Sequence, residues 1–128
     1  MSLSQDDLSV QDAVDAAVRQ LVSASHAEGA SHIHLPLFYP SGAAVTVSVE
    51  RVKVGYLVTD EGFAYREAEM VGAETQFADF ARIAAQELGV IATARMITAA
   101  ADRASLAAVI AGVGSASQMA ASAAVSAA

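Results

Sequence analysis

The sequence predicts an α+β domain, in which a small antiparallel sheet of three to five strands carries helices on one face, with long helices at both termini. Three observations lead to this prediction: a helical repeat near the N-terminus, period-two alternation in the middle of the chain, and a long alanine-rich segment at the C-terminus. With 128 residues the chain has the size of one ordinary domain. Residues 1–128 are therefore expected to form a single domain.

The first helix is predicted from about residue 5 to about residue 26. At the start of this helix, the Ser4 side chain can accept a hydrogen bond from an unpaired main-chain amide. Asp6 and Asp7 lie at the positive end of the helix dipole. Gly29 marks the end of this segment. Apolar residues recur at helical spacing and predict one buried stripe: Val10, Val14, Val18, Leu21 and Val22.

Strands are predicted next, because the apolar period changes from helical to two. Pro40-Ser41-Gly42 forms a turn, and a third strand is expected over residues 52–59, with a bend at Gly55. Alternating apolar residues define the two strands of the hairpin: Ile33, Leu35, Leu37, Val45, Val47 and Val49.

The second half is expected to contain three helices. One follows Gly62 and is closed by Gly72, and the next carries Phe77 and is closed by Gly89. Residues 90–99 fit short strands, and Asp102 begins a final helix with a stripe at Leu106, Val109, Ile110 and Val113. Residues 115–128 form an Ala/Ser-rich tail of low complexity, a composition prone to fraying.

The net charge of −7 is concentrated in the first part of the chain, since thirteen of the fourteen acids lie within residues 1–88. An acidic surface repels phosphate, and no basic run with interleaved aromatics occurs, so we expect no nucleic-acid partner. A protein with a basic surface is the natural alternative partner.

The cysteine count and the two terminal segments indicate where in the cell the protein is expected. The chain has no cysteine, which suits a reducing cytoplasmic location, and the N-terminus does not resemble a secretory signal. Residues 104–128 are uncharged, but strongly apolar side chains are too few among them for a typical span. We therefore expect a packed helix there and no membrane partner.

Several quoted segments together resemble a family. HLPLFYPSG, a valine-alternating strand, GYLVTDEG followed by a helix, and a phenylalanine-bearing helix ending in LGV come in the order found in the prokaryotic domain of unknown function 1828. The resemblance covers roughly residues 30 to 115. Glu61 stands where that family has a second aspartate, and Leu37 separates Pro36 from Phe38. The resemblance implies an accessory protein of bacteria, phages or other mobile elements, and no established activity.

Asp60 and Glu61, at the end of an apolar run, have two interpretations. In the first they only end a strand and start a helix: Asp60 accepts an amide hydrogen from Gly62 or Phe63, and Glu61 faces the helix dipole. His26, near the end of the first helix, then needs no role beyond the dipole.

The second interpretation makes the same acids part of an active site. His32 and His34 share one strand face, because strand side chains alternate. With Asp60 and Glu61 they would suit zinc or another first-row metal, and metal-activated water would then allow hydrolysis. The sequence favours the first interpretation, in which capping alone explains the acids.

Other chemistries find no support in the sequence. No Gly-x-Ser-x-Gly elbow is present, and Gly112-Val113-Gly114-Ser115 lies inside a predicted helix with no lysine after it. Phosphate loops and dinucleotide binding are therefore not expected, and we predict no cofactor.

Two surfaces are candidates for partner binding. Ala108, Gly112 and Ala116 recur every four residues and form a shallow ridge, which packs either within the chain or across a homodimer. Phe38 and Tyr39 are either an exposed aromatic anchor or part of the core edge. The sequence thus favours a non-catalytic, acidic protein-binding or regulatory domain. The alternative is a metal-dependent hydrolase.

Overall fold

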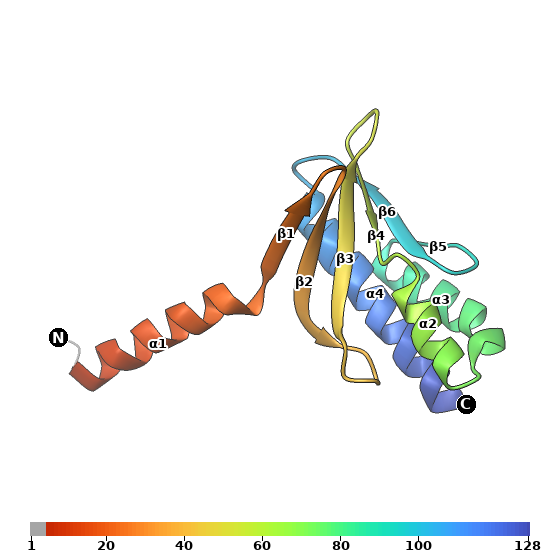
Figure 1. Ribbon diagram of the computed structural model, residues 1–128, viewed down its shortest axis with the longest axis horizontal. Helices are drawn as coiled ribbons and strands as arrows, with labels where there is room; N and C mark the ends of the chain where they lie inside the picture. Colours follow the sequence, from red (N-terminus) through yellow and green to blue (C-terminus); the bar gives the residue numbers. More distant parts are fainter. Residues whose placement is uncertain (1–4) are drawn as a thin grey trace.

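The computed structural model describes residues 5–128 and shows an α+β fold, as predicted (Figure 1). The Ser4 cap lies outside the described residues. In chain order the elements are α1 (Gln5–Leu21), β1 (Ser23–Ala27), β2 (Ala30–Phe38), β3 (Ala44–Arg51), β4 (Tyr56–Thr59), α2 (Phe63–Met70), α3 (Glu74–Leu88), β5 (Ile91–Ala92), β6 (Ile97–Ala101) and α4 (Leu106–Ala127).

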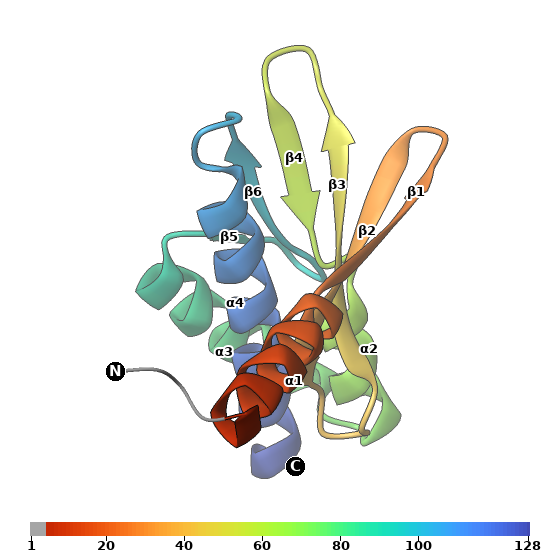
Figure 2. The same cartoon turned by 90° about the vertical axis from the view of Figure 1, so that its left-hand side faces the viewer.

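One antiparallel sheet organises the described chain. It has six strands, one more than the three to five predicted, and they lie in the order β1-β2-β3-β4-β6-β5. Helices α2, α3 and α4 cover one face of this sheet (Figures 1 and 2). The other face carries the second set of alternating side chains, including His32, His34, Thr46 and Thr59.

The core lies between that sheet face and the three helices. The period-two alternation explains it, because every second β3 residue faces inward and is buried: Val45, Val47 and Val49. Val58 and Ile97 extend the apolar layer across β4 and β6, and Phe77 of α3 completes it. Gly89 ends α3 with a φ of 68°, as its position after Leu88 predicts.

Helix α4 is the central helix of the core. Among the described helices it is the one long and apolar enough to cross a membrane, and here it packs against α2, α3 and the sheet. Residues 115–128, whose composition is prone to fraying, continue the helix as far as Ala127. Small side chains let it approach its neighbours closely, and these are fully buried: Ala116, Ser117, Ala120, Ala121 and Ala124.

The start of α4 also differs from the prediction. Asp102 precedes the helix by four positions, since α4 begins at Leu106. Asp102 Oδ1 accepts a hydrogen bond from the Ser105 amide at 2.8 Å, and Ser105 Oγ accepts one from the Asp102 amide at 3.1 Å. These bonds close a turn before the helix, and the Ser105 amide lowers the pKa of Asp102 because it donates to the carboxylate.

The N-terminal region holds the largest departure from the prediction. Helix α1 ends at Leu21 rather than near residue 26, and Ser23–Ala27 form strand β1, which the sequence pattern does not predict. Ala27 pairs with Ala30, so Glu28 and Gly29 form a two-residue hairpin turn, with Gly29 at a φ of 91°. Pairing with β2 overrides the weak local preference of this serine- and alanine-rich stretch.

The third predicted strand is shorter than expected. Strand β4 covers Tyr56–Thr59, and the four residues before it form the turn from β3. Gly55 makes the bend with a φ of 82°, and the backbone of Ala101 in β6 lies directly against it.

Candidate functional site

The two acids after β4 point in opposite directions. Asp60 is fully buried, and its Oδ1 accepts hydrogen bonds from the amides of Gly62 at 2.9 Å and Ile97 at 3.0 Å. The predicted bond from Gly62 is therefore present, although Gly62 rather than Asp60 is the N-cap residue of α2. Asp60 thus fixes both the start of α2 and the start of β6.

A buried chain of side-chain hydrogen bonds continues from Asp60. Asp60 Oδ2 accepts the hydroxyl hydrogen of Ser117 at 2.7 Å, and Tyr39 Oη lies 2.6 Å from Ser117 Oγ. Because Ser117 uses its one hydrogen toward Asp60, Tyr39 donates to Ser117. Burial raises the pKa of Tyr39 well above its usual range, and the charges of Asp60 and Glu67 raise it further.

The histidines of the predicted metal site do not converge on Asp60. His32 Nε2 lies 3.3 Å from Glu61 Oε1 on the open sheet face, whereas His34 Nδ1 lies 3.1 Å from Thr46 Oγ1. His26 Nδ1 lies 2.7 Å from Ser31 Oγ, in β1 rather than at a helix end. Among the side chains that the structure describes, from residue 9 onward, no three of His, Asp or Glu are grouped closely enough to hold a metal ion.

Glu61 has the one positive φ, 57°, among the described residues that are not glycine. Its amide donates to Thr59 Oγ1 at 3.0 Å, which holds this left-handed residue in the turn. The turn directs the Glu61 carboxylate outward to His32 while Asp60 is directed inward. Backbone conformation therefore separates the two neighbouring acids and removes the acid pair that an acid/base mechanism would need.

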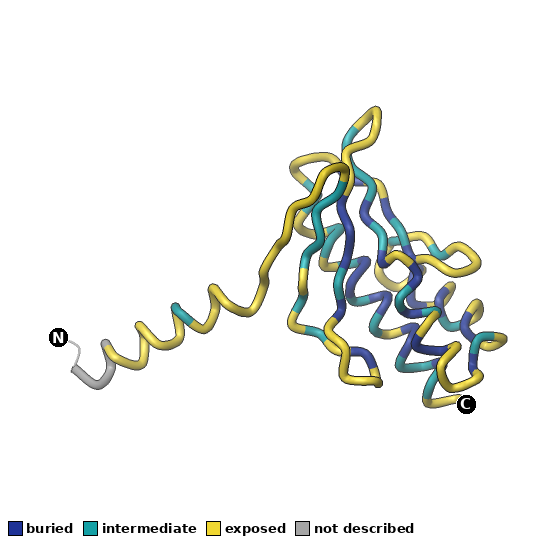
Figure 3. Tube along the Cα trace, in the orientation of Figure 1, coloured by how far each residue is buried: buried dark blue, intermediate teal, exposed yellow. Residues whose placement is uncertain are grey.

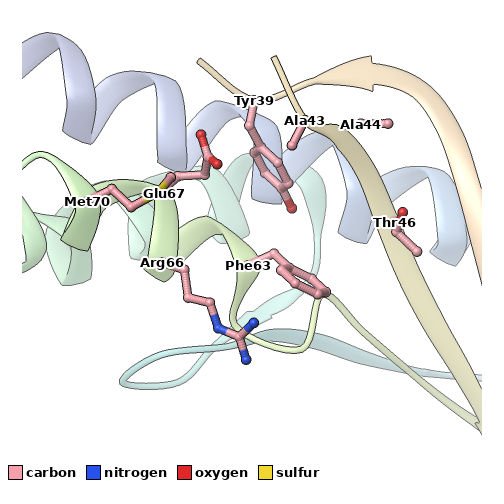
Figure 4. A pocket seen from close by; sticks show the side chains of 8 residues that line it. All are labelled: Tyr39, Ala43, Ala44, Thr46, Phe63, Arg66, Glu67 and Met70. Carbon is pink, nitrogen blue, oxygen red and sulfur yellow. The ribbon is translucent and has the colours of Figure 1, made fainter. Parts of the chain in front are cut away.

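A pocket of about 360 Å³ opens between α2 and the β2–β3 hairpin (Figure 4). Glu67 lies at its wall, is nearly buried, and accepts hydrogen bonds from the Ser41 amide at 3.0 Å and the Ser41 hydroxyl at 2.6 Å. The Arg66 guanidinium lies over the Phe63 ring, 4.9 Å from its centroid. Since Tyr39 is also hydrogen-bonded, the pocket presents no free nucleophile beside a free base.

The predicted partner-binding residues separate into exposed and buried members. Phe38 is 60% exposed, so it remains available to a partner, whereas Tyr39 is 4% exposed and belongs to the core. On α4, Ala108 is exposed, Gly112 is half-buried and Ala116 is fully buried. A Cβ at Gly112 would lie 3.4 Å from Val90, so the Gly112–Ala116 part of the ridge packs within the chain.

A row of exposed apolar side chains lies on a different helix. In place of the buried stripe predicted for α1, its apolar residues face solvent, and we call them the α1 stripe: Val10 (62% exposed), Val14 (52%), Val18 (56%) and Leu21 (55%). Helix α1 extends away from the sheet, and nearly all of it is exposed (Figures 1 and 3). The helical spacing was correct, but spacing alone cannot say what covers the apolar side.

A second apolar surface lies where α1 joins the domain. A groove of about 450 Å³ runs between β1, β2 and the first turns of α4, and we call it the β1–α4 groove. Its lining residues are all uncharged, and Ser23 is the one with a polar side chain: Val22, Ser23, Ala24, Ile33, Leu35, Ala107, Ile110 and Ala111.

The fold and these surfaces describe an α+β protein with a projecting amphipathic helix and no assembled catalytic group among the described residues. No family model, curated protein or solved structure matches the chain. The resemblance to the domain of unknown function 1828 therefore stays a prediction.

Proposed function

We propose that this chain is a non-catalytic protein-binding module and that α1 is its binding element. The observation that supports this most directly is the α1 stripe. Its four side chains are each more than half exposed, although they recur at the spacing typical of a helix that buries one face. A contiguous apolar surface of this kind marks an interaction site in a soluble protein.

The remaining surface agrees with a binding role. The polar side of α1 carries Asp12, Asp15 and Arg19, which can stay in water while the stripe is covered. The net charge of −7 favours approach to a basic surface and disfavours nucleic acid. We also propose a cytoplasmic location, in keeping with the absence of cysteine. A phage or mobile-element setting rests on the family resemblance alone.

The test compares three forms of the full chain. Val14→Gln with Val18→Gln makes the stripe polar, whereas Asp12→Gln with Arg19→Gln introduces the same side chains on the opposite side of α1 without changing net charge. Circular dichroism establishes that all three are equally helical. Each form is then used as bait in cell extracts. The molar mass of each purified form in solution is measured by light scattering.

We expect the unchanged chain and the Asp12/Arg19 variant to form the same stoichiometric complex, with themselves or with another protein. The Val14/Val18 variant should lose that complex, with affinity reduced at least about tenfold, because polar groups replace apolar contact. The proposal is wrong if all three forms make identical complexes, or if the unchanged chain makes none.

A further inference from the structure

We propose that the α1 stripe of one copy fills the β1–α4 groove of a second copy, so that the chain forms a symmetric dimer by exchanging α1. The inference rests on the proposed function, because it names the partner of α1. Its starting point is that one chain carries both an uncovered apolar stripe on α1 and an unfilled apolar groove.

The groove suits an apolar helix. Ile33, Leu35 and Ile110 provide its larger side chains, and Ala107 and Ala111 leave space above the first turns of α4. No charged residue lines it, so it has no group that would recognise a charged ligand. A helix laid into such a groove is held by apolar residues spaced like those of the α1 stripe.

The helix cannot reach the groove of its own chain. Helix α1 ends at Leu21 and β1 begins at Ser23, so Val22 is the one connecting residue. A helix that turns back to cover the strand after it normally needs a connection of about two to six residues. Figure 1 shows α1 leaving the sheet at this point, and α1 makes no substantial contact with the other helices or strands.

A second copy removes this constraint. Val22 lines the groove, so each α1 begins its outward course at the groove of its own chain and projects toward a neighbour. With 17 residues, α1 is about 25 Å long, enough to cross a small domain. A two-fold arrangement uses both helices and both grooves, which closes the assembly and leaves neither surface exposed. Asp12 and Asp15 remain on the side of α1 that faces water.

The experiment uses complementation between two defective chains. Val14→Gln with Val18→Gln damages the stripe, and Ala107→Glu with Ala111→Glu places charge in the groove at two exposed positions. Each variant alone should dimerise at least about tenfold more weakly than the unchanged chain by light scattering over a concentration series. An equimolar mixture should regain part of the dimer, because one intact helix then meets one intact groove. The Asp12→Gln, Arg19→Gln chain is the matched control and should dimerise normally.

Disulfide trapping gives the contact directly, because the chain has no cysteine of its own. Chains carrying Val14→Cys are mixed with chains carrying Ala111→Cys and oxidised gently. The mixed disulfide dimer should form readily, and it should be much scarcer when Arg19→Cys replaces Val14→Cys.

The outcomes separate the inference from the proposed function. If the purified chain is monomeric but α1 still mediates a complex with another protein, the inference is wrong and the proposed function stands. If Val14→Cys chains couple only with each other and the mixture regains no dimer, α1 pairs with α1, which overturns the groove assignment alone. A dimer that persists in the Val14/Val18 variant also overturns the inference. If no complex of any kind depends on α1, both proposals fail.

Discussion

The Ser117 hydroxyl of α4 donates to Asp60 Oδ2 at the end of β4 across 2.7 Å, and both residues are fully buried. Tyr39, which follows β2, extends this hydrogen-bond network through its contact with the Ser117 hydroxyl. A carboxylate inside an apolar core is costly unless every oxygen finds donors, and here each one does. The network therefore locks α2, α4 and β6 in place and keeps the Asp60 carboxylate away from solvent.

Removing the carboxylate should strongly destabilise the fold. Asp60→Ala leaves the amides of Gly62 and Ile97 and the Ser117 hydroxyl without an acceptor, so we expect a loss of about 3 kcal/mol in the free energy of unfolding. Urea denaturation measures it. Glu61→Gln is the control and should change stability by less than about 0.5 kcal/mol, since the His32–Glu61 pair is partly exposed. Equal effects of the two variants would contradict the network.

The Tyr39 and Ser117 hydroxyls should act together. Tyr39→Phe and Ser117→Ala each break the 2.6 Å contact between them, so the double variant should lose less stability than the sum of the two. We expect a coupling of about 1 kcal/mol in a double-mutant cycle measured by urea denaturation. Strict additivity would show that the two hydroxyls do not interact in solution.

Alkaline pH should weaken the fold through Tyr39. Its pKa is raised in the folded chain above the ordinary 10.0, so the unfolded chain loses this proton at a lower pH than the folded chain does. The stabilising contribution of the buried, protonated Tyr39 is complete below the pKa of the unfolded chain. It is lost as pH rises from there toward the higher pKa of the folded chain. The free energy of unfolding should therefore begin to fall near about pH 10 and continue to fall at higher pH, until Tyr39 also ionises in the folded chain, and Tyr39→Phe should show a smaller fall. An equal fall in both chains would count against a buried, protonated Tyr39.

Gly55 should tolerate substitution less well than Gly42. Both have a strongly positive φ, 82° and 92°, so alanine is strained at either site by about 1–2 kcal/mol. At Gly55 a Cβ would also lie 2.5 Å from the Ala101 carbonyl oxygen, whereas at Gly42 nothing lies within 4 Å. We expect Gly55→Ala to cost about 2 kcal/mol more than Gly42→Ala in thermal or urea unfolding. A similar loss at both sites would mean that β6 moves away easily.

Local patterns were sufficient for the central strands and most helices. The alternation of Val45, Val47 and Val49 predicts the buried face of β3, and Gly89 predicts the end of α3, because each signal depends on residues adjacent in the sequence. The hydrogen bond from the Gly62 amide to Asp60 is equally local, spanning two residues.

Local sequence patterns could not predict the contacts between segments that are distant in the sequence. Ser117 is one serine among many in an alanine-rich tail, and only the packing of α4 brings it to Asp60, 57 positions earlier. Strand β1 exists because β2 provides its hydrogen-bonding partners, which the weak preference of Ser23–Ala27 could not indicate.

By itself, then, the sequence determined which residues alternate, which recur at helical spacing and where turns interrupt them, because backbone geometry fixes these periods locally. The tertiary structure decided which apolar faces are covered: it buried the alanine face of α4 and left the α1 stripe in solvent. The physical reason is that burial depends on which surfaces meet in space. Helix α1, joined to its strand by Val22 alone, has no loop that would let it turn back onto its own domain, and it projects from that domain.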